Sequence, residues 1–128
     1  MANWAERYSN EEKVLFEKGD WSVTEDGEKT WSLYYKGECK EPVLDFNKYI
    51  LFKNGFLLYY EEFNSSSYLL FLKDHNRPIF TLSGKEISLE ADKNLIIFHS
   101  KEHGQTSFET ENLTKVCLAD NDQLGFDL

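Results

Sequence analysis

Residues 49–60 read YILFKNGFLLYY, and this stretch decides the fold class. An Asn-Gly pair, Asn54-Gly55, separates two short runs of β-branched, Leu and aromatic residues. Both residues of such a pair adopt positive φ readily, which makes it the strongest short-range signal for a β-hairpin. We therefore predict strands at 49–52 and 56–60 that are joined by a tight turn.

Similar turn signals recur along the chain at intervals of about 8 to 12 residues, as in antiparallel β proteins. Residues 56–60, 69–72 and 95–98 are apolar on both faces, which is typical of central strands that are covered on both sides. The sequence thus predicts an all-β fold, an antiparallel sandwich, meander or barrel of about eight to ten short strands. Further strands are predicted at 21–24, 30–35, 68–72, 79–82, 87–91, 95–99 and 106–110.

Both ends of the chain leave alternatives open. Ser9 and Glu12 have the spacing of a capping box, so residues 3–16 fit a short N-terminal helix, whereas residues 14–17 fit a first strand. Residues 112–118 fit either a last turn or a strand. Because no Pro-rich or Gly-rich linker divides the sequence, we expect one domain over residues 1–128.

Composition indicates a folded protein with its own core. The chain has 128 residues, of which 41% are hydrophobic, enough to bury a core without disulfides or metals. The first residues, MANWAERYSNEEKV, lack the basic start and apolar run of a signal peptide. No stretch approaches the roughly 18 apolar residues of a membrane helix. We expect a cytoplasmic protein in which Cys39 and Cys117 are reduced thiols.

No motif in the sequence predicts catalysis. His99 and His103 lie four residues apart, a spacing that places two zinc ligands on one face of a helix but not at a strand end and a turn. Glu61 and Glu62 are adjacent in a strand and point to opposite faces, so they make a poor glycosidase pair. Neither a dinucleotide-binding nor a phosphate-binding glycine motif is present. We therefore expect a protein that is not an enzyme and that holds no metal or cofactor.

Charge gives the clearest indication of a partner. The chain has 23 Asp and Glu against 14 Lys and Arg, a formal net charge of −9. Residues 102–128 contain six of these acids and one base. Such a surface repels nucleic acid and anionic lipid and favours cationic proteins.

In size, acidity, leaderless start and aromatic β framework, the chain resembles bacterial immunity proteins of contact-dependent growth inhibition and other polymorphic toxin systems. The bias of Lys over Arg, 12 of the 14 bases, adds to this resemblance. The resemblance implies a stoichiometric inhibitor that blocks the active site of a basic toxin, a ribonuclease or DNase domain. The acids of the inhibitor would stand in for substrate phosphates.

On this hypothesis the toxin contacts come from hairpin tips and from the C-terminal segment, with aromatic anchors beside them. Two alternatives remain. A lipocalin-like cup would bind an apolar small molecule, and an adaptor module would pair its exposed strands with a second copy. The expected oligomeric state is a monomer or weak dimer. The predicted partner-binding residues are Glu61, Glu62, Glu109, Glu111, Asp120, Asp122, Tyr59, Tyr60 and Trp31.

Overall fold

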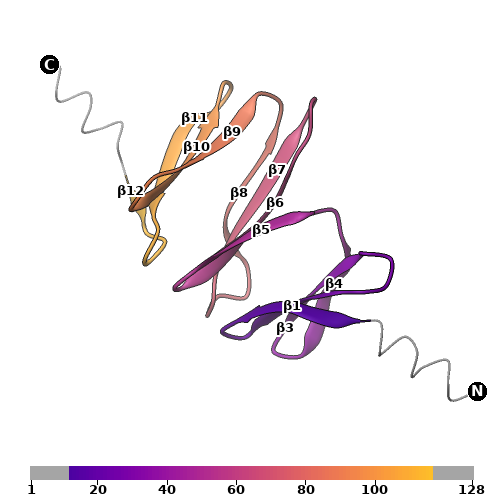
Figure 1. Cartoon of the computed structure of the whole chain (residues 1–128). Coiled ribbons are helices and arrows are strands. Elements are labelled where there is room, and N and C mark those ends of the chain that lie inside the picture. Colours follow the sequence, from indigo (N-terminus) through magenta and orange to yellow (C-terminus); the bar gives the residue numbers. More distant parts are fainter. Residues whose placement is uncertain (1–11, 117–128) are drawn as a thin grey trace, which may run out of the picture.

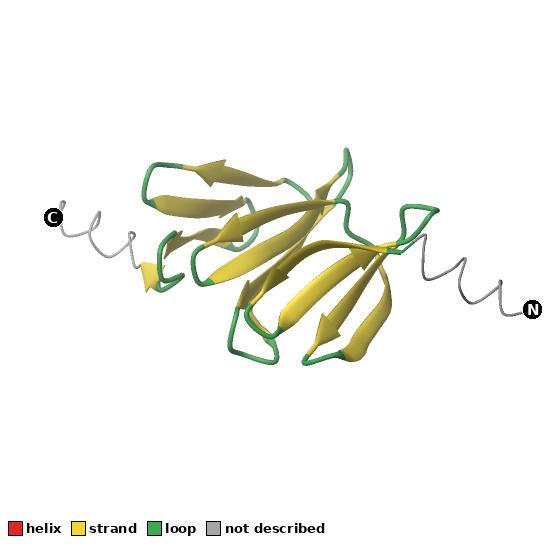
Figure 2. Cartoon of the chain, turned by 60° about the horizontal axis from the view of Figure 1, so that its bottom comes forward, coloured by secondary structure: helices red, strands yellow, loops and turns green. Residues whose placement is uncertain are grey.

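The computed structural model describes residues 12–116. Within this range, all regular secondary structure is β-strand (Figures 1 and 2). These strands form three antiparallel sheets of four, and in each sheet the strands follow one another in chain order. The fold is therefore three successive β-meanders, which confirms the predicted all-β antiparallel class. The strands are β1 (Lys13–Lys18), β2 (Trp21–Glu25), β3 (Trp31–Tyr35), β4 (Glu38–Leu44), β5 (Lys48–Phe52), β6 (Gly55–Glu61), β7 (Ser66–Leu72), β8 (Pro78–Gly84), β9 (Ile87–Ala91), β10 (Leu95–Ser100), β11 (Gly104–Glu109) and β12 (Lys115–Val116).

The structure has twelve strands in its described part, where about eight to ten were expected. The strand that was not predicted is β4, because its sequence ECKEPVL shows charges and a proline instead of alternation. The expected strand at 14–17 is part of β1, so residues 13–16 are not helical, and residues 3–11 of the alternative helix lie outside the described residues. At the other end, β12 forms within the segment 112–118.

The three sheets stack as layers, with the first sheet (β1–β4) and the last sheet (β9–β12) on opposite faces of the middle sheet (β5–β8) (Figure 1). Successive residues of a strand point to opposite faces, so β6 and β7 supply side chains to both interfaces. Phe56 and Leu58 point toward the first sheet, and Leu57 points toward the last sheet. Burial on both faces is why β6 reads as an uninterrupted apolar run.

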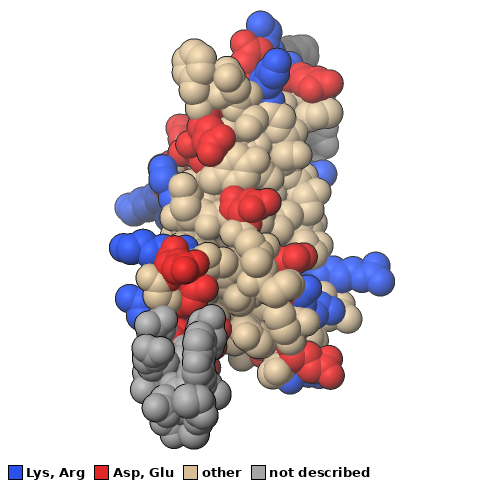
Figure 3. Space-filling model, turned by 90° about the vertical axis from the view of Figure 1, so that its right-hand side faces the viewer, with Lys and Arg blue, Asp and Glu red and all other residues tan. Residues whose placement is uncertain are grey.

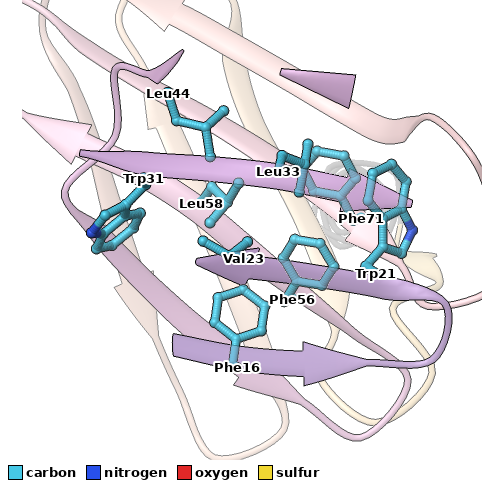
Figure 4. Packing of buried hydrophobic residues seen from close by; sticks show 9 residues of the cluster. All are labelled: Phe16, Trp21, Val23, Trp31, Leu33, Leu44, Phe56, Leu58 and Phe71. Atoms are coloured by element: carbon cyan, nitrogen blue, oxygen red, sulfur yellow. The ribbon is translucent and has the colours of Figure 1, made fainter. Parts of the chain in front are cut away.

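The core between the first and middle sheets is rich in aromatic rings (Figure 4). Phe56 stacks on Phe71 with ring centroids 4.7 Å apart, and the Trp21 ring meets Phe71 edge-on at 4.8 Å. Such pairs add to the stabilisation that comes from burial of their area. The buried residues of this first core are Phe16, Trp21, Val23, Trp31, Leu33, Leu44, Phe56, Leu58 and Phe71.

The core between the middle and last sheets is also aromatic. Phe98 lies 5.4 Å from Tyr68 and 4.9 Å from Phe80, measured between ring centroids. Phe80 comes from the edge strand β8, so this core extends to the edge of the middle sheet, where Phe80 and Leu82 border a hollow of about 370 Å³. The buried residues of this second core are Leu57, Tyr68, Leu70, Ile96, Phe98, Phe108 and Leu113.

The turn between β1 and β2 fastens the first sheet to the middle sheet. The Trp21 indole N–H donates to the His75 carbonyl oxygen at 2.8 Å, and the Asp20 N–H donates to the Lys73 carbonyl at 3.3 Å. Gly19 has φ of +60°, and a Cβ there would lie 2.6 Å from the Lys73 carbonyl oxygen. Only glycine allows this close approach, so the position of the first sheet depends on it.

No helix within residues 12–116 has the length and apolar character needed to cross a bilayer.

Candidate functional site

The edge strand β4 forms one wall of the candidate site. Its pairing with β3 is interrupted twice, because Leu33 lies opposite Glu41 while Trp31 lies opposite Leu44 and Tyr34 opposite Cys39. The edge of this strand is a poor partner for another strand, because its register is irregular and it carries Pro42 and several charges. Directly opposed residues share a sheet face, so Glu41 faces the middle sheet as the buried Leu33 does.

The residues of β8 that lie on the same face of the middle sheet are small or polar. Ser83 pairs with Ser67, and Thr81 pairs with Leu69. The bulky β8 residues Phe80 and Leu82 belong to the opposite face and to the second core. Beside β4, the open space borders Ser67, Leu69 and Phe71 of β7 and Pro78 of β8.

A groove of about 500 Å³ occupies this space between the first and middle sheets. It follows β7, whose alternate residues Ser67, Leu69 and Phe71 line its floor. The volume lies within the range of roughly 300–1,000 Å³ that is common for binding pockets. Its lining residues are Trp21, Leu33, Lys40, Glu41, Val43, Leu44, Asp45, Phe46, Tyr60, Ser67, Leu69, Phe71, Asn76 and Pro78.

One end of the groove is formed by aromatic side chains. Phe46 and Tyr60 are both half-buried, and their ring centroids lie 6.0 Å apart. The Asn47 N–H donates to the Tyr59 carbonyl at 3.3 Å, which holds the β4–β5 connection against β6. Tyr60 lies opposite Ser67 in the sheet, so this end adjoins the turn between β6 and β7.

Three charged side chains line the groove, Lys40, Glu41 and Asp45. Neither Glu41 nor Asp45 forms an ion pair with another residue of the described range, and Lys40, which precedes Glu41, forms none either. By contrast, the carboxylates of Glu25 and Glu86, outside the groove, lie 3.5–3.6 Å from Lys amines. Two carboxylates and one amine beside an apolar floor give the groove lining a net charge of −1, which favours a cationic partner.

The predicted contact residues Tyr59 and Glu61 lie on the other face of the middle sheet. Tyr59 stacks on Tyr68 with ring centroids 5.5 Å apart, and the Tyr68 hydroxyl donates to Glu61 at 2.5 Å. Lys48 lies 3.8 Å from the same carboxylate. Burial, reinforced by the hydrogen bond to Glu61, raises the pKa of Tyr68 well above its usual value. Within residues 12–116, Glu61 therefore acts as a partner of a core tyrosine.

The predicted acids of the last sheet are engaged in local structure. One Glu109 carboxylate oxygen accepts from the Asn112 N–H at 3.1 Å and from the Thr114 hydroxyl at 3.4 Å. Glu111 pairs with Lys53 at 3.2 Å beside the turn that begins β6, whereas Glu61 ends β6. Seven residues of strand separate these two places by about 20 Å. Glu61 and Glu111 therefore do not form one surface.

The remaining predicted residues lie in three different places: at the groove, in the first core and outside the described range. Tyr60 lines the groove, and Glu62 is exposed in the turn just beyond it. Trp31 is only 7% exposed and belongs to the first core, with its indole N–H donating to Glu25 at 3.1 Å. Its burial leaves little surface for the predicted role as an anchor. Asp120 and Asp122 lie outside the described residues.

Charged side chains elsewhere are dispersed. On the face shown in Figure 3, acidic and basic groups alternate along the molecule with uncharged surface between them. Within residues 12–116, no three His, Cys, Asp or Glu side chains gather in an arrangement that could hold a metal ion. Cys39 is a free, exposed thiol, and Cys117 lies outside the described range.

The sequence prediction missed Glu41, Val43, Asp45 and Phe46. The segment 41–46 carries no recognisable motif, and its place in the groove depends on residues of β7 and β8 that follow more than twenty positions later. The exposed acids beside Val43 and Phe46 were the available signal. No family model, curated protein or solved structure matches this chain.

Proposed function

We propose that this chain is an acidic, protein-binding inhibitor that neutralises a cationic toxin of the nuclease type by covering its active site. The groove between the first and middle sheets is the docking surface in this proposal. The observation that carries it is the pair of carboxylates, Glu41 and Asp45, that stand without an ion pair beside an apolar floor. The inhibitor itself performs no chemistry, and its partner brings the basic residues.

Physical considerations support a protein partner with basic and apolar groups side by side. A Lys or Arg of the partner would lie against Glu41 or Asp45, while an adjacent apolar side chain would fill the space over Leu69 and Phe71. Removal of one member of a buried, hydrogen-bonded charge pair costs roughly 2–5 kcal/mol, and a charge at the rim matters mainly for the association rate. The net charge of −9 would accelerate encounter with a basic protein at low salt.

The first experiment asks whether the reading frame next to this gene encodes a basic protein that the chain binds. We expect that protein to be toxic when it is expressed alone and harmless when it is expressed with this chain. Purified chain should bind a catalytically inactive form of it in calorimetric titrations, with one chain per toxin. A neighbouring product that is acidic, or that the chain does not bind, would contradict the proposal.

Charge reversal locates the contact. The double variant Glu41→Lys, Asp45→Lys should weaken binding by about 2 kcal/mol or more and should flatten the dependence of Kd on salt. The double variant Glu90→Lys, Glu102→Lys is the matched control, because it changes the net charge by the same four units and both acids are exposed on the last sheet. Equal effects of the groove and control variants would mean that only net charge matters and that the groove is not the site.

A second candidate function is the binding of an apolar small molecule in the same groove. The volume of about 500 Å³ and the apolar floor favour it. In this case an uncharged apolar ligand would bind with little dependence on salt, and the double charge reversal would leave its Kd nearly unchanged.

A further inference from the structure

The turn between β6 and β7 carries an unusual side chain. Phe63 is 100% exposed, while the other large apolar residues that are exposed within residues 12–116 retain 37–59% of their surface. A phenylalanine in this position contributes no burial to the fold. In an interface, an aromatic side chain buries roughly 150–250 Å². The turn therefore holds apolar surface that folding does not use.

The turn that carries Phe63 is held at its base. The Glu62 N–H donates to the Ser65 carbonyl at 2.9 Å, and the flanking strands remain paired up to Glu61 and Ser66. The Glu61 carboxylate is fixed in addition by the Tyr68 hydroxyl. A side chain presented on a short closed turn loses little further freedom when it binds.

The Phe63 turn continues the groove. Tyr60 and Ser67 pair across the strands at the groove end, so the turn begins two residues beyond that end. Glu62 is exposed there and forms no ion pair with a described residue. Acidic and apolar side chains therefore occur both in the groove, with Glu41 and Asp45, and in the adjoining turn, with Glu62 and Phe63. Residues 62–65 of the turn include no base.

We infer that Phe63 is a second anchor for the same cationic protein, and that it inserts into an apolar pocket whose rim carries Lys or Arg residues that meet Glu62. This inference rests on the proposed function and adds to it the surface that the partner must present. An anionic bilayer is disfavoured as the target of Phe63, because Glu61 and Glu62 flank it and would be repelled. A single exposed ring is also small beside the roughly 800 Å² that each partner of a stable dimer buries.

The test is a titration of the inactive toxin, encoded by the adjacent reading frame, with Phe63→Ala. We expect Kd to rise about 30-fold, which corresponds to about 2 kcal/mol and is typical of an aromatic hot spot. Leu51→Ala is the matched control. Leu51 is 45% exposed on β5, at the edge of the middle sheet opposite β8, and its removal should leave Kd unchanged. The melting temperature of Phe63→Ala should equal that of the wild type, so loss of folding cannot mimic the effect.

The outcomes separate the two proposals. If Phe63→Ala binds as the wild type does while the Glu41→Lys, Asp45→Lys variant binds weakly, the second anchor is refuted and the groove stands. If the wild type does not bind the toxin, the proposed function fails and the inference fails with it. Binding of the wild type, but not of Phe63→Ala, to vesicles of phosphatidylcholine and phosphatidylglycerol would assign Phe63 to a membrane instead and overturn the inference. A wild-type dimer that Phe63→Ala converts to a monomer in sedimentation experiments would overturn it as well.

Discussion

The two faces of the middle sheet are built from the same strands, yet the face toward the last sheet is the more filled and the face toward the first sheet is the more open. Toward the last sheet, Phe80 of β8 reaches Phe98 and Phe108, with ring centroids 4.9 and 5.1 Å away. Toward the first sheet, the groove is lined by Ser67, Leu69 and Phe71 of β7 and by Pro78 of β8. The interface with the last sheet keeps a smaller hollow of about 370 Å³ beside Phe80 and Leu82, against about 500 Å³ in the groove.

The acidic side chains on the two faces of the middle sheet also differ in their partners. On the filled side, Glu61 is tied to Tyr68 and Lys48. On the open side, Glu41 and Asp45 have no basic partner among residues 12–116. Carboxylates that already have partners stabilise the fold, whereas free ones remain to attract a cationic protein. The local pairing of an acid is thus more informative here than the total charge.

The largest expected effect comes from truncation of the two cores. Phe98→Ala should lower the free energy of unfolding by about 3–5 kcal/mol, since Phe98 is fully enclosed. Phe71→Ala should cost less, because Phe71 borders the groove and the cavity left behind is open to solvent. Urea denaturation of both variants measures the difference. Equal losses would mean that the first core is as tightly sealed as the second.

The next effect concerns the contact that positions the first sheet. Gly19→Ala and Gly37→Ala both place a Cβ on a residue with positive φ, +60° and +82°, which costs about 1–2 kcal/mol. At Gly37 nothing lies within 4 Å of the new atom, whereas at Gly19 the Lys73 carbonyl lies 2.6 Å away. Gly19→Ala should therefore cost about 1–3 kcal/mol more in thermal or urea unfolding. A similar loss of unfolding free energy in both variants would contradict a tight contact between Gly19 and the Lys73 carbonyl.

A smaller effect appears at alkaline pH on the filled side. Burial raises the folded-state pKa of Tyr68 above its ordinary value of 10.0, so above this pH the unfolded chain releases a proton that the folded chain retains. The stability associated with Tyr68 is complete below pH 10 and is lost as pH rises above it. In Tyr68→Phe, the decline of unfolding free energy with pH should be shallower by up to about 1.4 kcal/mol per pH unit. Identical slopes for the variant and the wild type would contradict the burial of this hydroxyl.

The smallest effect on stability is expected on the open side. Glu41→Lys and Asp45→Lys should each change the free energy of unfolding by less than about 0.5 kcal/mol, because neither carboxylate has a partner to lose. A marked destabilisation by either substitution, measured by urea denaturation, would show that these acids serve the fold and would weaken their proposed role in binding.

Local patterns explain how much of this architecture the sequence could predict. Asn54-Gly55 specifies its hairpin by turn chemistry alone, and the uninterrupted apolar run at 56–60 correctly indicated a strand that is covered on both faces. The strand β4 was missed because edge strands with bulges, proline and charges lose the alternation that identifies a strand.

The candidate site was harder to predict because it combines distant segments. Tyr60, predicted as an aromatic anchor, lines the groove, but its neighbour Phe46 is recognised only when β4 and β6 are placed together. Total charge drew attention to the acids of the C-terminal region, such as Glu111. The structure instead separates Glu41 and Asp45, which line the groove, from acids such as Glu111 that pair with a distant base, and this difference depends on tertiary contacts.

The most direct test of the central claim is an NMR titration of ¹⁵N-labelled chain with the inactive basic protein encoded by the adjacent reading frame. We predict that amide signals of groove residues such as Val43, Ser67 and Leu69 shift on binding. Signals of Ser88 and Glu90, which are exposed on the last sheet, should stay in place. Shifts confined to the last sheet, with the groove signals unmoved, would contradict the account.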